Sequence, residues 1–325
     1  MSLRCPLKGQ TVLVTGGAGF IGSHLVDRLI SDDAAHVVVI DNLFCGSEDN
    51  LCEARQSGRV TFYNDDAELH TSLEYIFSRH QIDTVFNCAT KALNYSFLNP
   101  ANAYSTNVTA ILHLLELQRR GAFKTICHFS TSEVYGSAVY EPMDEQHPRN
   151  PTTTYAAGKA AADMAVESYV RMFGLDAFIV RPFNNYGPRQ NYKGMLAGII
   201  PITVWRILNN IAPELHGNGL QSRDFIYVHD TVDAVVKLYQ KMPAGDSINI
   251  STDNQITVAE LLPRICRDMG YTGEIINKQG RKSDVLCHIA SNVKIRTLID
   301  YPLTPFEQGL RDTLAWYKAN IKLHP

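Results

Sequence analysis

The sequence has no apolar run long enough to cross a membrane and no strong excess of either charge. Its 325 residues include 30 Lys and Arg against 33 Asp and Glu, which gives a formal net charge of -3. A spanning helix needs about 20 apolar residues, and nucleic-acid-binding domains usually carry a basic excess. The N-terminal stretch MSLRCPLKGQ also lacks the apolar core of a signal peptide. We therefore expect neither a nucleic acid nor a membrane as a partner.

Cysteine and histidine lack the spacings of a metal site or a disulfide framework. The 7 cysteines are widely separated with no C-x-x-C pair, and the 11 histidines form no H-E-x-x-H motif. Cysteines inside apolar runs usually behave as small hydrophobic residues. The sequence therefore predicts no metal ion and a reducing, cytoplasmic location.

The first half of the chain contains a regular alternation of short β-rich runs and amphipathic segments. The strands are apolar throughout, as expected for strands that are covered on both faces. This alternation predicts an α/β fold with a Rossmann-type, doubly wound parallel sheet. The expected strands are 11–15, 36–41, 60–63, 83–89, 124–130 and 176–183, and the expected helices are 22–31, 69–80, 101–120 and 152–174.

The alternation fades after about Arg181, where Pro and Gly become frequent in RPFNNYGPRQ and HGNGLQSRD. Such punctuation is typical of turns and irregular connections. We therefore assign residues 1–180 to the Rossmann domain. Residues 181–325 are assigned mainly to a smaller C-terminal lobe, with some chain returning to the first domain.

A glycine-rich turn, TGGAGFIGSHL, joins the first expected strand to the first expected helix. Gly16, Gly19 and Gly22 permit a tight turn and a close approach of backbone to a pyrophosphate. The strand–turn–helix context supports a dinucleotide site more strongly than the glycines alone. Asp41 ends the second strand, where a carboxylate suits ribose hydroxyls and favours NAD over NADP. Asp66, after the third strand, is expected to face the adenine.

Two clusters of polar residues follow at positions where the fold alone does not require polar side chains. The stretch FSTSEVYGSA places Thr131, Ser132 and Glu133 after a buried strand, where an unused carboxylate is costly. Tyr155 and Lys159 lie one helical turn apart on one face of the next helix. An ammonium near a phenol stabilises the phenolate, which can then take a proton from a hydroxyl. The bare Y-x-x-x-K spacing is also common on solvated helix faces.

Taken together, these stretches resemble the nucleotide-sugar epimerase/dehydratase group of the extended short-chain dehydrogenase/reductases. The matching stretches are TGGAGFIGSHL, STSEVYG, YAAGK, RPFNNYGPRQ and GNGLQSRDFIYVHD, in family order over nearly the whole chain. The resemblance implies NAD as cofactor and Thr131, Tyr155 and Lys159 as a catalytic trio. Tyr155 would remove the proton of the sugar 4-hydroxyl while NAD accepts hydride from C4. The expected cofactor contacts are Gly16, Gly19, Phe20, Ile21, Gly22, Asp41, Asn42, Asp66, Tyr155 and Lys159.

Four residues are expected to contact a nucleotide-sugar substrate. The resemblance assigns Asn184 to its phosphate, and assigns Arg223 and Arg281 to its pyrophosphate and ribose, which suits an arginine fork. Arg223 has the alternative of pairing with Asp224, and GRKSDV around Arg281 departs from the family pattern. Lys91 lies in NCATK, where the family usually has HLAA. It is either a residue that binds a substrate carboxylate or an ordinary lysine of a surface loop.

The triplet of Thr131, Ser132 and Glu133 bears on the reaction that follows C4 oxidation. Simple epimerases of the family usually have small neutral residues after the catalytic Ser or Thr. Similar triplets occur in 4,6-dehydratases and in nucleotide-glucuronate decarboxylases. A C4 ketone acidifies the C5 proton, which Glu133 can remove as a general base. The sequence favours an NDP-hexose 4,6-dehydratase and leaves a UDP-glucuronate decarboxylase or a 4-epimerase open. Ser132 stands where many dehydratases have an aspartate, so the acid for the C6 hydroxyl is not identified.

A protein of a different class, a non-catalytic NAD-binding regulator or scaffold, also has to be weighed because fold does not fix function. Such a protein is expected to have lost the catalytic trio. Thr131, Tyr155 and Lys159 are all present, which favours an enzyme.

The segments 101–120 and 156–174 are apolar on more than one face. In the family the corresponding helices pair across a two-fold axis as a four-helix bundle, so the resemblance implies a homodimer. The alternative is that both helices simply cover the sheet.

Overall fold

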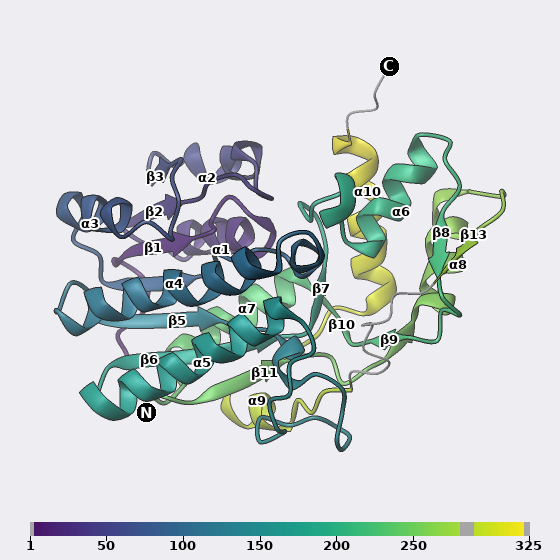
Figure 1. Cartoon of the computed structure of the whole chain (residues 1–325). Coiled ribbons are helices and arrows are strands. Elements are labelled where there is room, and N and C mark those ends of the chain that lie inside the picture. The colour runs from purple at the N-terminus through teal and green to yellow at the C-terminus, as the bar shows by residue number, and fades with distance from the viewer. Residues whose placement is uncertain (1–2, 280–288, 322–325) are drawn as a thin grey trace.

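The chain folds around a seven-stranded sheet with helices on both faces (Figure 1). In this computed structural model, the structure describes residues 3–279 and 289–321. The strands of the sheet are β1 (Thr11–Thr15), β2 (His36–Ile40), β3 (Val60–Tyr63), β4 (Thr84–Asn87), β5 (Thr125–Phe129), β6 (Asp176–Pro182) and β11 (Ser247–Ile250). Their order is β11-β6-β5-β4-β1-β2-β3, and every neighbouring pair is parallel. The predicted α/β class with a Rossmann-type sheet is confirmed.

The central strands supply two separate hydrophobic cores. Val12 and Val14 of β1 pack into the core on one face, whereas Leu13 packs into the core on the other. In β4, Phe86 and Val85 divide between the faces in the same way. Because successive strand residues point to opposite faces, an unbroken apolar run buries side chains on both.

Helices at the predicted positions cover the two faces. α4 (Pro100–Arg119) begins where the Asn99 side chain accepts a hydrogen bond from the N–H of Asn102, and α5 (Thr154–Phe173) begins at a similar cap made by Thr153. α5 ends at Gly174, which has a left-handed backbone conformation. One face carries α1 (Phe20–Ser31) and α7 (Val228–Tyr239), and the other carries α3 (His70–Arg79), α4 (Pro100–Arg119) and α5 (Thr154–Phe173).

A smaller lobe lies to the right of the sheet in Figure 1. Its core is largely aromatic and aliphatic, and includes Tyr186, Phe225, Leu261, Leu310 and Tyr317. The elements of this lobe are β7 (Asn184–Tyr186), α6 (Ile199–Leu208), β8 (Glu214–His216), β9 (Ser222–Arg223), β10 (Phe225–Tyr227), β12 (Ile256–Thr257), α8 (Val258–Met269), β13 (Ile276–Lys278) and α10 (Phe306–Asn320).

Residues beyond 181 also contribute one strand of the sheet and two helices that pack near it. β11 pairs with β6 at the edge of the sheet, α7 packs against α1, and α9 (Val293–Leu298) contacts β11. The remaining short helical segments are η1 (Glu48–Leu51), α2 (Cys52–Arg55), η2 (Leu93–Phe97), η3 (Ser132–Tyr135) and η4 (Gly194–Leu196).

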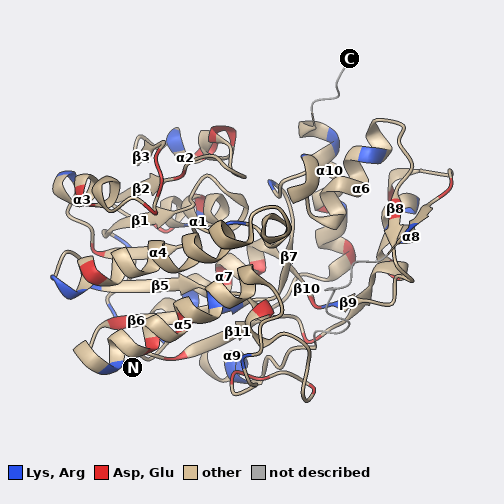
Figure 2. Cartoon of the chain, viewed as in Figure 1, with Lys and Arg blue, Asp and Glu red and all other residues tan. Residues whose placement is uncertain are grey.

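Charged residues of both signs are interspersed over the two parts of the molecule, as Figure 2 shows in this view. In the part of the chain that the structure describes, no helix is both long and apolar enough to cross a bilayer. The described cysteines are free thiols, namely Cys5, Cys45, Cys52, Cys88, Cys127 and Cys266.

Candidate active site

The glycine-rich turn between β1 and α1 requires glycine at two positions. Gly16 has a φ of +66°, and a Cβ there would lie 2.8 Å from the backbone nitrogen of Ala89. A Cβ on Gly22 would clash with the carbonyl oxygen of Gly16. The turn therefore keeps bare backbone at the N-terminus of α1, where free N–H groups favour an anion.

Substitution of Gly22 by alanine is expected to weaken NAD binding about tenfold or more, which corresponds to about 1.4 kcal/mol. The added Cβ forces the first turn of α1 away from Gly16 and so disturbs the backbone that faces the pyrophosphate. Calorimetric titration with NAD measures the effect. Gly58→Ala is the control, since Gly58 does not line the cavity and a Cβ there meets open space, so any strain from its φ of +70° stays local. Unchanged NAD affinity in Gly22→Ala would contradict this assignment.

The residues predicted for the ribose and adenine lie together beside the glycine-rich turn. Asp41 accepts the N–H of Ala18 at Oδ2 (3.0 Å) and the N–H of Leu43 at Oδ1 (2.8 Å). Burial raises the pKa of Asp41, and these backbone hydrogen bonds act in the opposite direction. Asn42 donates from Nδ2 to Oδ2 of Asp66 at 2.8 Å. The Asp41 carboxylate is therefore fixed in place next to the turn.

Thr131, Tyr155 and Lys159 come together at the carboxyl end of β5. Thr131 follows this strand, and its Oγ1 accepts the N–H of Glu133 at 3.3 Å. Tyr155 and Lys159 lie one turn apart on α5, as the sequence predicts. Lys159 is buried, and its Nζ donates a hydrogen bond to the carbonyl oxygen of Phe129 at 2.8 Å. The strand end and the helix thus bring the three side chains to one place.

Burial dominates the proton affinities at this position. Burial raises the pKa of Tyr155 to about 12, with Glu133 acting in the same direction and the hydroxyls of Thr131 and Thr90 in the opposite one. Burial also lowers the pKa of Lys159 to about 8. In the protein alone, Tyr155 is therefore a neutral phenol at neutral pH, and Lys159 is still mostly protonated although its pKa is much nearer to neutrality than usual.

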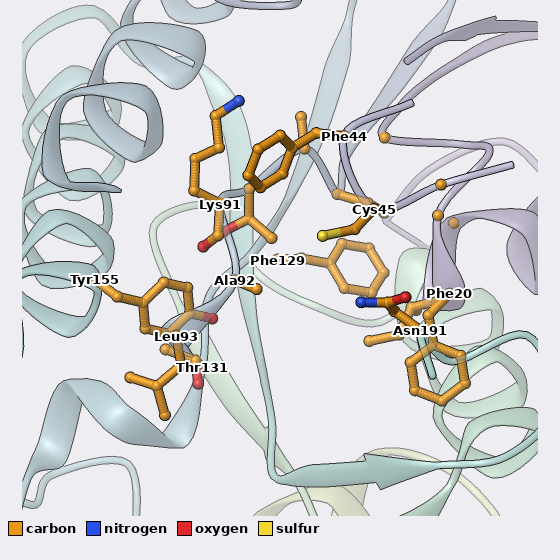
Figure 3. A pocket seen from close by; sticks show the side chains of 18 of the residues that line it. Phe20, Phe44, Cys45, Lys91, Ala92, Leu93, Phe129, Thr131, Tyr155 and Asn191 are labelled. Carbon is orange, nitrogen blue, oxygen red and sulfur yellow. The ribbon is translucent and has the colours of Figure 1, made fainter. Parts of the chain in front are cut away.

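A single cavity of about 460 Å³ connects the glycine-rich turn with Tyr155. In the view of Figure 3, Tyr155 and Thr131 lie on one side, and Phe20 and Asn191 lie on the other. Among residues 3–279 and 289–321, no group of His, Cys, Asp or Glu side chains is arranged to hold a metal. The predicted residues that line the cavity are Gly16, Gly19, Phe20, Ile21, Gly22, Asp41, Asn42, Asp66, Lys91, Thr131, Ser132, Glu133, Tyr155, Lys159 and Asn184.

Comparison with known proteins identifies the family. A family model described as GDP-mannose 4,6 dehydratase matches residues 13–311. The chain belongs to the nucleotide-sugar epimerase/dehydratase family. This family is the group of extended short-chain dehydrogenase/reductases that the sequence motifs resemble, so that prediction is confirmed.

Relatives within the nucleotide-sugar epimerase/dehydratase family include both reaction types. A putative UDP-glucose 4-epimerase of Methanocaldococcus jannaschii is 33% identical over 312 residues, which cover 95% of this chain and 99% of the relative. The human dTDP-D-glucose 4,6-dehydratase is 30% identical over 322 residues, which cover 96% and 91%. The crystal structure of the dTDP-glucose 4,6-dehydratase DesIV of Streptomyces venezuelae, with NAD and TYD bound, is 29% identical. It superposes with a TM-score of 0.90 over 95% of this chain and 97% of that one.

Glu133 and Ser132 occupy the first turn after Thr131. Both belong to η3, both are buried, and both line the cavity. Thr131 caps this turn, since its Oγ1 accepts the Glu133 N–H. The triplet is therefore held rigidly at the cavity wall.

Lys91 is buried in the cavity wall, 8% exposed, so its interpretation as an ordinary surface-loop lysine is wrong. Its Nζ lies 4.1 Å from the centroid of the Phe44 ring, and Figure 3 shows the two side chains together. A cation–π contact of this kind stabilises an ammonium that has lost part of its water shell. The unusual NCATK segment thus introduces a positive charge into the site.

The three residues predicted to bind substrate phosphate or ribose differ in their placement. Asn184 lines the cavity, and its Nδ2 is buried with no hydrogen-bond partner among the described residues. Arg223 belongs to β9 and is not one of the described residues that line the cavity; its NH1 donates to the carbonyl oxygen of Ser222 at 2.9 Å. Arg281 lies outside the described residues.

The carboxylate of Asp224 is engaged by the loop that follows β11. It accepts hydrogen bonds from the N–H and hydroxyl of Thr252, at 2.8 and 2.7 Å, and from the N–H of Asp253 at 2.9 Å. Burial raises the pKa of Asp224 to about 6. Asp224 thus joins β9 to that loop next to Arg223.

Thr90 and Asn107 also lie beside Tyr155, although no sequence motif predicted them as site residues. Thr90 Oγ1 donates to Asn107 Oδ1 at 2.7 Å, and the Thr90 hydroxyl lowers the pKa of Tyr155. The available signal was the amide of Asn107 within STNVTAIL, in a segment predicted to be a helix. Its place beside the site depends on close packing of α4 and α5, where a Cβ on Gly158 would lie 2.8 Å from the carbonyl oxygen of Tyr104.

Proposed function

We propose that the chain is an NAD-dependent NDP-hexose 4,6-dehydratase that works through a C4 ketone. The family supports the coarser function of a nucleotide-sugar modifying enzyme. The observation that carries the dehydratase is Glu133, a buried carboxylate that lines the cavity two residues from Thr131. Dehydration requires a base for the C5 proton, whereas simple epimerisation at C4 does not.

NAD fits the cradle around the glycine-rich turn. Gly16 and Gly22 leave the backbone bare at the N-terminus of α1, and Asp41 offers a fixed carboxylate to ribose hydroxyls. DesIV, a structural relative, contains NAD. When bound, NAD accepts hydride from C4 and returns it later to C6 of the sugar.

Tyr155 acts as the base towards the sugar 4-hydroxyl. Burial opposes formation of its phenolate, so positive charge is needed to offset the high pKa. The Lys159 ammonium supplies part of this charge from the neighbouring turn of α5. Thr131 accepts the Glu133 N–H at Oγ1, and its own hydroxyl lowers the pKa of Tyr155 through a side-chain hydrogen bond, so it supports the phenolate directly.

Glu133 removes the C5 proton once C4 is a ketone. Loss of the C6 hydroxyl then gives an unsaturated ketone, and reduction at C6 with proton return at C5 gives a 4-keto-6-deoxy sugar. Ser132 lies beside Glu133 at the same wall, and we assign it to binding the C6 hydroxyl. The overall reaction therefore removes one water molecule from the sugar and involves no net oxidation or reduction.

The smaller lobe, within residues 181–325, supplies the groups for the nucleotide and its phosphates. The buried Nδ2 of Asn184 has no hydrogen-bond partner among the described residues, so it is available to donate to a phosphate oxygen. Arg223 and Arg281 are the proposed arginines for the pyrophosphate and ribose. Residues 1–180 form the NAD-binding domain in this proposal.

A UDP-glucuronate decarboxylase is the second candidate, and the buried Lys91 favours it. A 4-keto-uronate loses carbon dioxide without a C5 base, and its site has to hold a carboxylate. The Nζ of Lys91 over Phe44 is a cation in the cavity wall that suits this group. We rank the dehydratase first because decarboxylation does not require Glu133 as a base.

Mass spectrometry of products from a panel of UDP, GDP, CDP and dTDP sugars tests these proposals. Loss of water supports the dehydratase, loss of carbon dioxide supports the decarboxylase, and turnover without a change in mass supports a 4-epimerase. If NAD is bound and no sugar is converted, the protein is a non-catalytic NAD-binding regulator or scaffold.

We also propose a homodimer formed through α4 and α5. These helices pack against each other and expose Tyr104, Met164, Met172 and Phe173. The expected result is a dimer mass in light scattering at micromolar concentration. Met164→Glu and Met172→Glu together are expected to give a folded monomer, because charge is unfavourable in an apolar interface. A monomeric parent protein would contradict the proposal.

A further inference from the structure

A row of buried polar side chains crosses the sheet beneath the active site, and no step of the proposed reaction uses it. Thr15 and Asn87 end β1 and β4, and His128 is the last residue but one of the adjacent β5; the three lie in register, Thr15 opposite Asn87 and Asn87 opposite His128. All three are essentially inaccessible to water, as is Asp163 on α5. Polar groups so deep in a sheet are retained only when they form a satisfied network or serve the site.

Each hydrogen bond of this row is donated in the direction from Thr15 towards His128. Thr15 Oγ1 accepts the N–H of Ala89 at 3.2 Å, so its own hydrogen goes to Asn87 Oδ1 at 2.6 Å. Asn87 then presents its amide N–H to Nδ1 of His128 at 3.1 Å. Because Nδ1 is thereby an acceptor, a neutral His128 carries its hydrogen on Nε2.

The Nε2 hydrogen of His128 is directed at Asp163. His128 Nε2 and Asp163 Oδ1 lie 3.9 Å apart, and neither atom has a hydrogen-bond partner among residues 3–279 and 289–321. The other oxygen of Asp163, Oδ2, accepts a hydrogen bond from Arg181 Nε at 3.0 Å and forms an ion pair with Arg181 Nη2 at 3.0 Å. The Nε2–Oδ1 separation exceeds the range of a hydrogen bond, so a small rotation would be needed to form one; the Ser130 hydroxyl also lowers the pKa of Asp163.

Asp163 lies one helical turn beyond Lys159 on α5, on the same face. Charged or titratable groups from several elements surround this lysine. Asp163 of α5 raises its pKa, and so does Cys88, which follows β4. His128 of β5 is neutral, because burial holds its pKa well below the usual value, with Lys159 and Arg181 of β6 acting in the same direction. The groups near the lysine thus include one carboxylate, that of Asp163, which adjoins the row.

We propose that the row Thr15–Asn87–His128 fixes the carboxylate of Asp163, and that His128 and Asp163 are positioning residues for Lys159 and hence for the proton transfer at Tyr155. This inference rests on the proposed role of Tyr155 as the base. It holds for any reaction that begins with C4 oxidation. The glycine-rich turn is part of the same arrangement, because the row starts at Ala89, whose nitrogen lies against Gly16.

The sign of the effect follows from the charges. Asp163 keeps Lys159 protonated against the effect of burial. If the carboxylate turns away or takes a proton, Lys159 loses its charge at lower pH, and Tyr155 becomes harder to ionise. Hydride transfer should then require a higher pH. Glu133, which raises the pKa of Tyr155 from η3, is unchanged by substitutions at His128.

Two substitutions at His128 separate positioning from packing. His128→Asn keeps an acceptor near the position of Nδ1 and removes the donor at Nε2. His128→Gln carries an amide donor that reaches the position of Nε2. Asp163→Asn is less suitable, because it leaves the buried Arg181 without its carboxylate. The measurement is the pH dependence of single-turnover NAD reduction by a nucleotide sugar that the parent protein oxidises.

We expect His128→Asn to move the acidic limb of this profile to higher pH by about half a unit or more, and to slow hydride transfer roughly threefold below the limb. The rate on the alkaline plateau should stay near the parent value, and His128→Gln should restore the parent profile. An unchanged limb in His128→Asn overturns the inference. An equal loss in both variants at every pH also overturns it, since that result indicates packing alone.

A second measurement does not depend on turnover. The titration of Lys159 can be followed by NMR of lysine-labelled protein, with Lys159→Arg providing the assignment. The midpoint should fall in His128→Asn and not in His128→Gln, and an unchanged midpoint in His128→Asn overturns the inference. If no nucleotide sugar reduces NAD, the proposed function fails, and this titration still decides whether the row acts on Lys159.

Discussion

Replacement of Tyr155 by phenylalanine is expected to reduce hydride transfer about 10³-fold, because it removes the group that takes the 4-hydroxyl proton. Burial raises the pKa of this phenol to about 12, so its function depends on charges that surround it only in the assembled site. The loss should occur with every nucleotide sugar that the protein converts, since C4 oxidation precedes each of the candidate reactions. Stopped-flow measurement of NAD reduction in a single turnover gives the rate directly.

Tyr75→Phe is a matched control for this variant. Tyr75 is exposed on α3 and removal of its hydroxyl should leave the rate unchanged. The Tyr155→Phe protein should also keep the parent affinity for NAD to within a few fold, which separates a chemical defect from a folding defect. Parent-like NAD reduction in Tyr155→Phe would show that another group is the base.

Substitution of Glu133 by glutamine is expected to stop dehydration while sparing oxidation at C4. The neutral amide keeps the size of the side chain and removes the base for the C5 proton, at a cost of about 10²- to 10⁴-fold in elimination. The variant should therefore form the C4 ketone and reduced cofactor in the first turnover and then stall. Absorbance of reduced cofactor, together with mass spectrometry of the sugar, measures both steps.

Glu141→Gln makes the same chemical change at an exposed position of the following loop and should behave like the parent. Dehydration at the parent rate in Glu133→Gln would rule out Glu133 as the C5 base. Unchanged epimerisation in that variant would instead favour the 4-epimerase. Unchanged release of carbon dioxide would favour the decarboxylase and direct attention to Lys91→Met.

The parallel sheet and its helices could be predicted because each depends on local pattern. The apolar runs ending at Thr15, Ile40 and Phe129 are too uniform for one-sided strands, and amphipathic segments separate them. The glycine-rich turn could also be predicted from the sequence, because the local backbone geometry requires glycine at positions 16 and 22. β11 was not predicted, since its four residues join the sheet through pairing with β6 alone.

Short contiguous motifs are enough to assign the family and the fold class, and they also predict Thr131, Tyr155 and Lys159 as the catalytic trio. Tertiary structure decided the environment of those motifs. Lys91 is buried against Phe44, which the NCATK stretch does not reveal. The row from Thr15 through Asn87 to His128 exists only because parallel strands bring residues far apart in sequence into register. Burial and charge depend on such long-range packing, so the proton affinities of Tyr155 and Lys159 follow from the folded molecule.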